Sequence, residues 1–146
     1  LLIIKTKKME KYFYFRNAAS AAEEDDDATG STYYPLSSFR GMCSGTAAVT
    51  GTVTDDADAF SMFFTPKAVV AGGGENQALT NNVDVVVVAI TTDNGQKEVM
   101  DAIMDKIVAH PHATPVITVY DKNKGGTEVK LHTDIEGITV LHNTNA

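Results

Sequence analysis

The sequence predicts an α+β domain: a small, mainly antiparallel sheet, curled or closed into a partly open β-barrel, with one amphipathic helix. Two observations lead to this fold class. About six short segments rich in β-branched and aromatic residues are separated by turn signals. One stretch, at about residues 96–109, has helical periodicity instead. With no internal repeat in the chain, six strands and one helix favour a single curled sheet whose face or end the helix covers.

The helix is the clearest of the predicted elements. Its apolar side chains fall on one face: Val99, Met100, Ile103, Met104, Ile107 and Val108. Asp93 or Asn94 is expected to cap the first turn, and Gln96, three residues after Asp93, completes a capping-box pattern. Pro111 is expected to stop the helix.

The predicted strands begin with MEKYFYFR at residues 9–16, which carries aromatic side chains on both faces and is expected to be covered on both sides. AFSMFF, at 59–64, is a second strand. The uninterrupted β-branched run at 83–91 is predicted to be the most buried strand. Three alternating runs, at 115–121, 126–133 and 137–143, indicate an antiparallel meander.

Polar segments between these strands are predicted to be loops. Residues 17–32 include five consecutive acidic residues, and residues 44–57 are small, polar and acidic. Between these two loops, YYPLSSFRGM is predicted to hold a short helical turn that ends at Gly41, with Ser37 and Ser38 as caps. A further loop is expected around Gly72 to Gly74.

Length and composition indicate one domain at residues 9–146. A chain of 146 residues with 43% hydrophobic and 21% charged residues can bury a core by itself. Residues 1–8 are expected to be a disordered extension ahead of a natural start at Met9. Cys43, the sole cysteine, excludes an intramolecular disulfide. No apolar run approaches the ~20 residues that span a bilayer, so no membrane segment or secretion signal is predicted.

Charge bears on possible partners. The formal net charge is −7, which opposes binding to phosphate backbones, because such binding depends on lysine and arginine. The acidic runs at 23–27 and 55–58 are interpreted as solvated loops, with calcium binding as the alternative. Four histidines, His110, His112, His132 and His142, lack the spacing of a metal site. We therefore predict neither a metal nor a cofactor.

No pattern of catalytic residues is recognisable. Cys43 lacks the context of a nucleophile, and the glycines at 72–74 are not followed by the lysine and hydroxyl residue of a phosphate loop. Ser37 and Ser38 lack the glycines of a nucleophile elbow. The chain is therefore predicted not to be an enzyme.

The aromatic segment near the N-terminus supports an alternative function. Tyr12 and Tyr14, with Lys11 and Arg16 beside them, resemble a base-stacking strand of a small Sm-like or OB-like barrel. The competing interpretation is a core strand, because aromatic residues commonly fill both faces of a packed strand. The acidity of the whole chain favours the core strand.

Four segments carry a resemblance to a known class of proteins: MEKYFYFR, DDDATGS, YPLSSFRGM and KEVMDAI. In this order the chain resembles small virion-associated structural proteins of marine tailed bacteriophages, such as cyanophages. The resemblance spans residues 9–107 and has no ligand or catalytic motif. It implies a capsid, decoration or tail-associated component that works as a homo-oligomer, located in the virion or the host cytoplasm. Long polar loops and strands able to pair at an edge are compatible with this assembly role.

Overall fold

The computed structural model describes residues 10–18, 30–67, 83–109 and 115–143. The elements in these ranges are, in order, β1 (Tyr12–Arg16), β2 (Ser31–Pro35), the 3-10 turn η2 (Leu36–Ser38), β3 (Phe39–Ser44), β4 (Thr46–Ala47), β5 (Val53–Thr54), β6 (Ala59–Phe64), β7 (Asp84–Ile90), α1 (Gln96–Val108), β8 (Val116–Lys124), β9 (Thr127–Lys130) and β10 (Ile135–Leu141).

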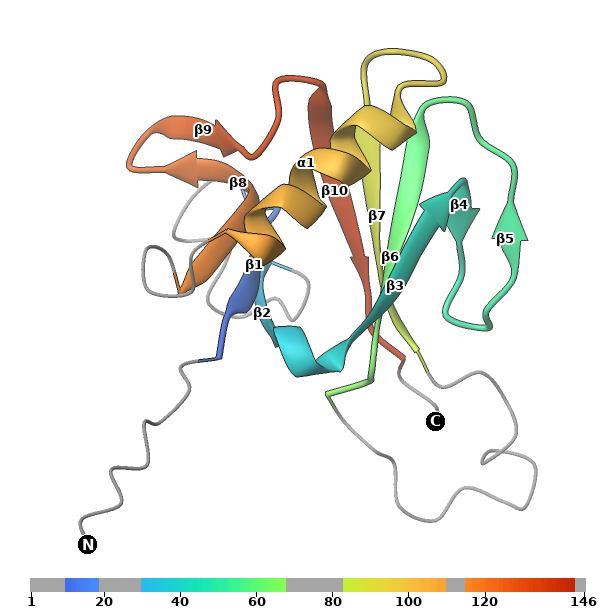
Figure 1. The fold of residues 1–146 in the computed structure, drawn as a ribbon, viewed down its shortest axis with the longest axis horizontal. Helices are drawn as coiled ribbons and strands as arrows, with labels where there is room; N and C mark the ends of the chain where they lie inside the picture. Colours follow the sequence, from blue (N-terminus) through green and yellow to red (C-terminus); the bar gives the residue numbers. More distant parts are fainter. Residues whose placement is uncertain (1–9, 19–29, 68–82, 110–114, 144–146) are drawn as a thin grey trace, which may run out of the picture.

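The strands form three separate sheets (Figure 1). Sheet A has the order β2-β1-β8-β9, sheet B has the order β10-β7-β6-β3, and β4 and β5 form a hairpin. All neighbours are antiparallel except β1 and β8, which run parallel. The α+β fold class is confirmed. The predicted barrel is wrong, because the sheets do not close, and so is the count of six strands, because the described residues contain ten.

The additional strands lie where the sequence indicated turns and loops. The expected helical turn is only the three residues of η2, and the residues on either side of it belong to β2 and β3. The predicted loop at 44–57 contains the β4–β5 hairpin. Both hairpin strands are two residues long, too short for alternation to be recognised in a sequence.

The predicted meander is only partly present. β8 and β9 form an antiparallel hairpin, but β10 pairs with β7 in sheet B. A turn closed by the bond from the Ile135 amide to the His132 carbonyl, 3.1 Å long, precedes β10. After this turn Ile135, Ile138 and Val140 join the core as residues of sheet B.

One hydrophobic core lies between the two four-stranded sheets and the helix. It joins Phe13 and Phe15 of β1 to Phe64 of β6 and to the inner side chains of β7, β8, β10 and α1. The residues of β1 that face away from this core are less covered, and Tyr12 is 41% exposed. The sequence predicted that both faces of β1 would be covered. In the described residues, only the face toward the core is fully buried.

The predicted strand at 83–91 is present as β7 and is mostly buried, but it is not the most buried strand, because β6 has a larger share of buried residues. In β7, Val85, Val86, Val88 and Ile90 are at most 1% exposed. Val86 and Val88 face the main core, whereas Val85 belongs to a second cluster with Ala47 and Val83. This strand is apolar on both faces because sheet B has residues packed on each side of it.

Helix α1 lies across the front of the molecule in Figure 1 and ends one residue earlier than predicted. The side chains of its residues Val99 and Ile103 are fully buried in the core. The predicted cap is wrong: Gly95 occupies the N-cap without a side-chain hydrogen bond. The Gln96 amide instead donates to the carbonyls of Asp56 and Ala57, at 2.9 and 2.8 Å, which ties the start of the helix to the segment before β6.

Several predictions fall outside the described residues: the extension at 1–8, the acidic run at 23–27, the glycines at 72–74, and His110 with His112. Within the part of the chain that the structure describes, no helix is both long enough and apolar enough to cross a membrane.

Candidate functional site

The most exposed apolar side chains of the helix lie on one of its flanks. Met104 is 43% exposed and Val108 is 75% exposed, and with the half-buried Met100 they repeat at the four-residue spacing that lines up side chains along a helix. Lys106 and Ala109, on the opposite flank, face β8. Since α1 packs against both β8 and β3, the methionine side of the helix faces β3.

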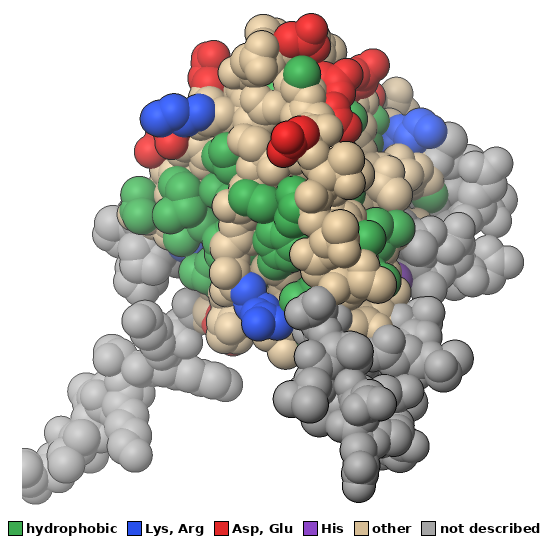
Figure 2. All heavy atoms as spheres, turned by 90° about the vertical axis from the view of Figure 1, so that its right-hand side faces the viewer, with side chains coloured by type: hydrophobic (Ala, Val, Ile, Leu, Met, Phe, Trp, Pro, Cys, Tyr) green, Lys and Arg blue, Asp and Glu red, His purple; other side chains and the backbone are tan. Residues whose placement is uncertain are grey.

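The half-buried residues of η2 and β3 continue this surface. We define the apolar flank as Leu36, Phe39, Met42, Met100, Met104 and Val108; the first four pack against the core while remaining partly exposed. Figure 2 shows hydrophobic side chains gathered across the middle of the side that includes β3 and the hairpin, with acidic side chains above them.

An open sheet edge borders the apolar flank. Among the described residues, β3 pairs with β6 on one side and with no strand on the other. Arg40 is the one charged residue of its sequence, FRGMCS. Open edges attract further strands unless charges, prolines or bulges blunt them. Here a register shift between Phe39 and Gly41 interrupts only the first part of the edge.

A buried polar cluster joins the two large sheets. The Tyr34 hydroxyl of β2 donates a 2.6 Å hydrogen bond to Asp84 Oδ2 of β7. The other carboxylate oxygen accepts the Asn143 amide at 2.8 Å, and His142 Nδ1 lies 3.2 Å from Oδ2. Burial and the hydrogen bond to Asp84 raise the pKa of Tyr34 above its ordinary value.

This cluster connects the two sheets, and its polar groups are not accessible to a substrate. Tyr34 and Asp84 are at most 1% exposed, and the hydroxyl and carboxylate already bind each other. The Lys67 ammonium lies 4.6 Å from the centre of the Tyr34 ring and donates to the Thr32 hydroxyl. Burial lowers the pKa of Lys67. One feature of the sequence indicated this cluster: the aspartate in the apolar run VDVVVV. A carboxylate buried in such a strand needs hydrogen-bonding partners from elsewhere in the chain.

The structure divides the four residues of the predicted nucleic-acid surface. Lys11 is 6% exposed, shares the inner face of the sheet with Phe13, and donates to carbonyls at the end of α1. Arg16 donates to the Asn123 carbonyl at 2.7 Å and lies 3.6 Å from Asp121. Tyr12 and Tyr14 remain on the outer face of sheet A. Lys11 lies on the opposite face, and Arg16, which shares the outer face with the tyrosines, is engaged by Asp121 and the Asn123 carbonyl.

Tyr14 has an aromatic neighbour on this outer face. Its ring stacks on that of Tyr33 with centroids 4.5 Å apart. Partial burial raises the pKa of Tyr14. Tyr33 itself is 51% exposed, so the outer face of sheet A carries a small tyrosine patch without a free cation from β1.

The described histidines and aspartates do not converge on a metal site. His132 lies 3.6 Å from Glu98, whereas His142 belongs to the cluster around Asp84. Across residues 10–18, 30–67, 83–109 and 115–143, no group of three or more histidine, cysteine, aspartate or glutamate side chains has metal-binding geometry.

The acidic segment at 55–58 has local structural contacts. Asp56 accepts hydrogen bonds from the Thr46 hydroxyl at 2.8 Å and from the Asp58 amide at 3.2 Å. A hydrogen bond between the two carboxyl groups lowers the pKa of Asp56 and raises that of Asp58. Asp56 therefore fastens the hairpin to the segment before β6.

Comparisons with known proteins give no relative: no family model, curated protein or solved structure matches this chain.

Proposed function

We propose that the protein is a non-enzymatic structural component that works as a homo-oligomer, and that the apolar flank meets a second copy of the chain. The observation that carries this proposal is the exposure of Met104 and Val108 beside the open edge of β3. Contiguous exposed apolar surface of this kind marks interaction sites in soluble proteins. Methionine is suited to such surfaces because its flexible side chain adapts to the partner.

The neighbouring edge is compatible with pairing to itself. If two copies of β3 pair antiparallel about Met42, Gly41 lies opposite Cys43, and Arg40 lies opposite Ser44. No two like charges then face each other across the strands, whereas like charges directly opposite each other would destabilise the pairing. A two-fold axis through Met42 places the same surface on both sides of the interface, as a symmetric dimer requires.

The resemblance to virion-associated proteins of marine tailed bacteriophages supports the same function. Proteins of that class act by assembly, and the segments that carry the resemblance include η2 and part of α1. On this proposal the chain is a capsid, decoration or tail-associated component, found in the virion or in the host cytoplasm during assembly.

Light scattering of the purified protein over a range of concentrations tests the proposal. We expect a discrete oligomer, and we expect Val108→Lys to shift the population to the monomer, because a lysine ammonium cannot be buried against methionine without a large desolvation cost. Tyr12→Lys is the control, since Tyr12 is 41% exposed on the outer face of sheet A, in a different sheet from β3. A strictly monomeric wild-type protein at high concentration, or equal dissociation by both variants, would contradict the proposal.

A further inference from the structure

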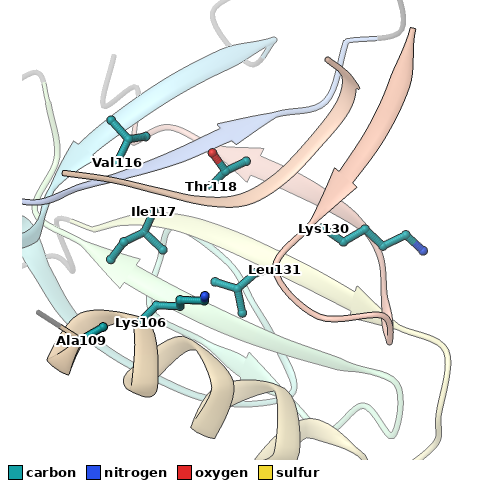
Figure 3. Close-up of a pocket in the computed structure, with 7 residues that line it drawn as sticks. All are labelled: Lys106, Ala109, Val116, Ile117, Thr118, Lys130 and Leu131. Atoms are coloured by element: carbon teal, nitrogen blue, oxygen red, sulfur yellow. The ribbon is translucent and has the colours of Figure 1, made fainter. Parts of the chain in front are cut away.

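A groove lies on the side of α1 opposite the apolar flank. It has a volume of about 310 Å³ and is lined by Lys106, Ala109, Val116, Ile117, Thr118, Lys130 and Leu131. In Figure 3, Ile117, Leu131 and Lys106 border the space between β8 and the helix, whereas Val116 and Thr118 project from the other side of the strand. The groove thus follows the margin of β8.

This margin is an unpaired strand edge. β9 pairs with β8 only from Tyr120 onward, so no described strand lies beside Val116 to Thr118 on that side. The Tyr12 amide donates to the Pro115 carbonyl at 2.8 Å, which places the main-chain groups of Pro115 toward β1. Because these groups alternate along a strand, those of Val116 and Thr118 point away from β1 and toward the open edge.

The groove also has a distinct charge. Its lining contains two lysines and no acidic residue, although the chain has a net charge of −7. Lys106 extends from the helix into the groove in Figure 3, whereas Lys130 lies 3.2 Å from Glu128 and points away from the helix. The remaining side chains, apart from Thr118, are apolar. A ligand for this groove therefore has main-chain hydrogen-bonding groups, apolar side chains and negative charge.

We propose that this groove binds an extended acidic peptide segment of a partner protein, which adds to β8 as a further strand. Addition of a strand to an open edge derives affinity from main-chain hydrogen bonds and specificity from pockets for alternate side chains. The free edge from Val116 to Thr118 is three residues long, roughly 10 Å at the rise of a strand. The peptide's apolar side chains lie against Ile117 and Leu131, and its carboxylates face Lys106.

Fluorescence anisotropy with three labelled peptides tests this proposal. The first alternates glutamate with valine, the second alternates lysine with valine, and the third is the glutamate peptide with every second amide N-methylated. We expect saturable binding of the first peptide alone, and we expect salt to weaken it. The second peptide should not bind because its lysines are repelled by the lysines of the groove, and the third should not bind because it lacks the N–H donors that pair with the strand edge. No saturable binding of the glutamate peptide, or equal binding of either comparison peptide, would overturn the proposal.

A pair of charge reversals on one helix locates the binding. Lys106→Glu is expected to weaken binding of the glutamate peptide about tenfold or more. Lys97→Glu makes the same charge change at a position paired with Asp101, away from the groove lining, and is expected to leave binding unchanged. Equal effects of the two variants would show that only the overall charge of the protein matters, and would contradict binding in this groove. The expected binding does not depend on the oligomeric state, so this proposal can fail or hold independently of the proposed function.

Discussion

Tyr34 and Asp84 connect the two large sheets through a hydrogen bond of 2.6 Å between residues 50 positions apart. Tyr34 belongs to the edge strand of sheet A, and Asp84 begins a central strand of sheet B. Tyr34 also stacks on Phe64 of sheet B, with ring centroids 4.2 Å apart. The same side chain therefore contributes both an apolar and a polar contact between the sheets.

The Tyr34 hydroxyl is expected to make the protein sensitive to alkali. Burial, together with Asp84, raises its folded pKa above the value of 10.0 that applies to an ordinary tyrosine. Its stabilising contribution is fully present below pH 10 and declines as the pH rises above 10 toward the folded pKa, because only the unfolded chain then releases the proton. Denaturant unfolding at pH 8 to 11 should show this decline.

The variant Tyr34→Phe is expected to lose most of this dependence. At neutral pH it should be less stable by about 1–3 kcal/mol, because Asp84 loses a buried donor. Tyr33→Phe, at the exposed neighbouring position, is the control and should retain the alkaline decline. Tyr120, whose pKa is raised to about 12 by burial and by Glu128, is expected to leave a smaller residual dependence. An unchanged pH profile in Tyr34→Phe would contradict this assignment.

Lys11 is expected to stabilise the end of α1. Its ammonium donates to the carbonyls of Lys106, Ile107 and Ala109 at 3.0, 3.3 and 2.7 Å. These carbonyls lie where a helix has no internal partners and where the helix dipole favours positive charge. Lys11→Met keeps the apolar stem and should lower the free energy of unfolding by about 1–3 kcal/mol.

Lys97→Met is the control for this measurement, because Lys97 is exposed and pairs only along the helix surface with Asp101. Thermal unfolding followed by circular dichroism compares the two variants. If Lys11→Met melts at the wild-type temperature, the carbonyls at the end of α1 do not depend on the ammonium.

Gly45 is expected to be required for the hairpin to fold back. Its φ is +102°, and an added Cβ would lie 2.5 Å from the Thr54 carbonyl oxygen. Gly45→Ala should therefore destabilise the protein by more than about 1 kcal/mol. Gly137→Ala, where a Cβ would meet no atom within 4 Å, should have little effect. Chemical denaturation of both variants checks this, and equal stability of the two would show that the strand connection tolerates a side chain.

Single-stranded RNA is expected not to bind. The tyrosines on the outer face of sheet A lie in a chain of net charge −7, and the nearby cations Lys11 and Arg16 are engaged by α1 and by Asp121. Binding to single strands combines stacking with neutralisation of phosphates, and only the first component is present here. Anisotropy of a labelled oligonucleotide at low salt measures this. Saturable binding that Tyr12→Ala abolishes would restore the nucleic-acid alternative.

The sequence predicted elements that depend on local pattern. The repeat of Val99, Ile103 and Ile107 located α1 to within one residue, and the run of valines located β7. The alternation in β1 also placed Lys11 on the same face as Phe13, although its charge gave no indication of burial. Its partners are 95 to 98 positions away, and nothing in the local sequence identifies them.

Features that depend on distant pairing could not be predicted in this way. β2 ends at Pro35 and β3 contains Gly41, and both residue types typically mark turns in a sequence. The separation of β10 from β9 follows from its packing beside Val86 and Val88. Neither the apolar flank nor the groove has a sequence motif, since each combines the helix with a strand from another part of the chain.

The parallel pairing of β1 with β8 has a consequence for the order of synthesis. β1 precedes most of the described chain, but the strand beside it in the centre of sheet A follows the helix. The β3, β6 and β7 strands of sheet B are all made earlier than β8. On the ribosome, β1 can therefore pair with β2 and pack Phe13 and Phe15 against Phe64 before β8 has emerged, whereas the β1 edge that β8 later covers stays unpaired during that interval.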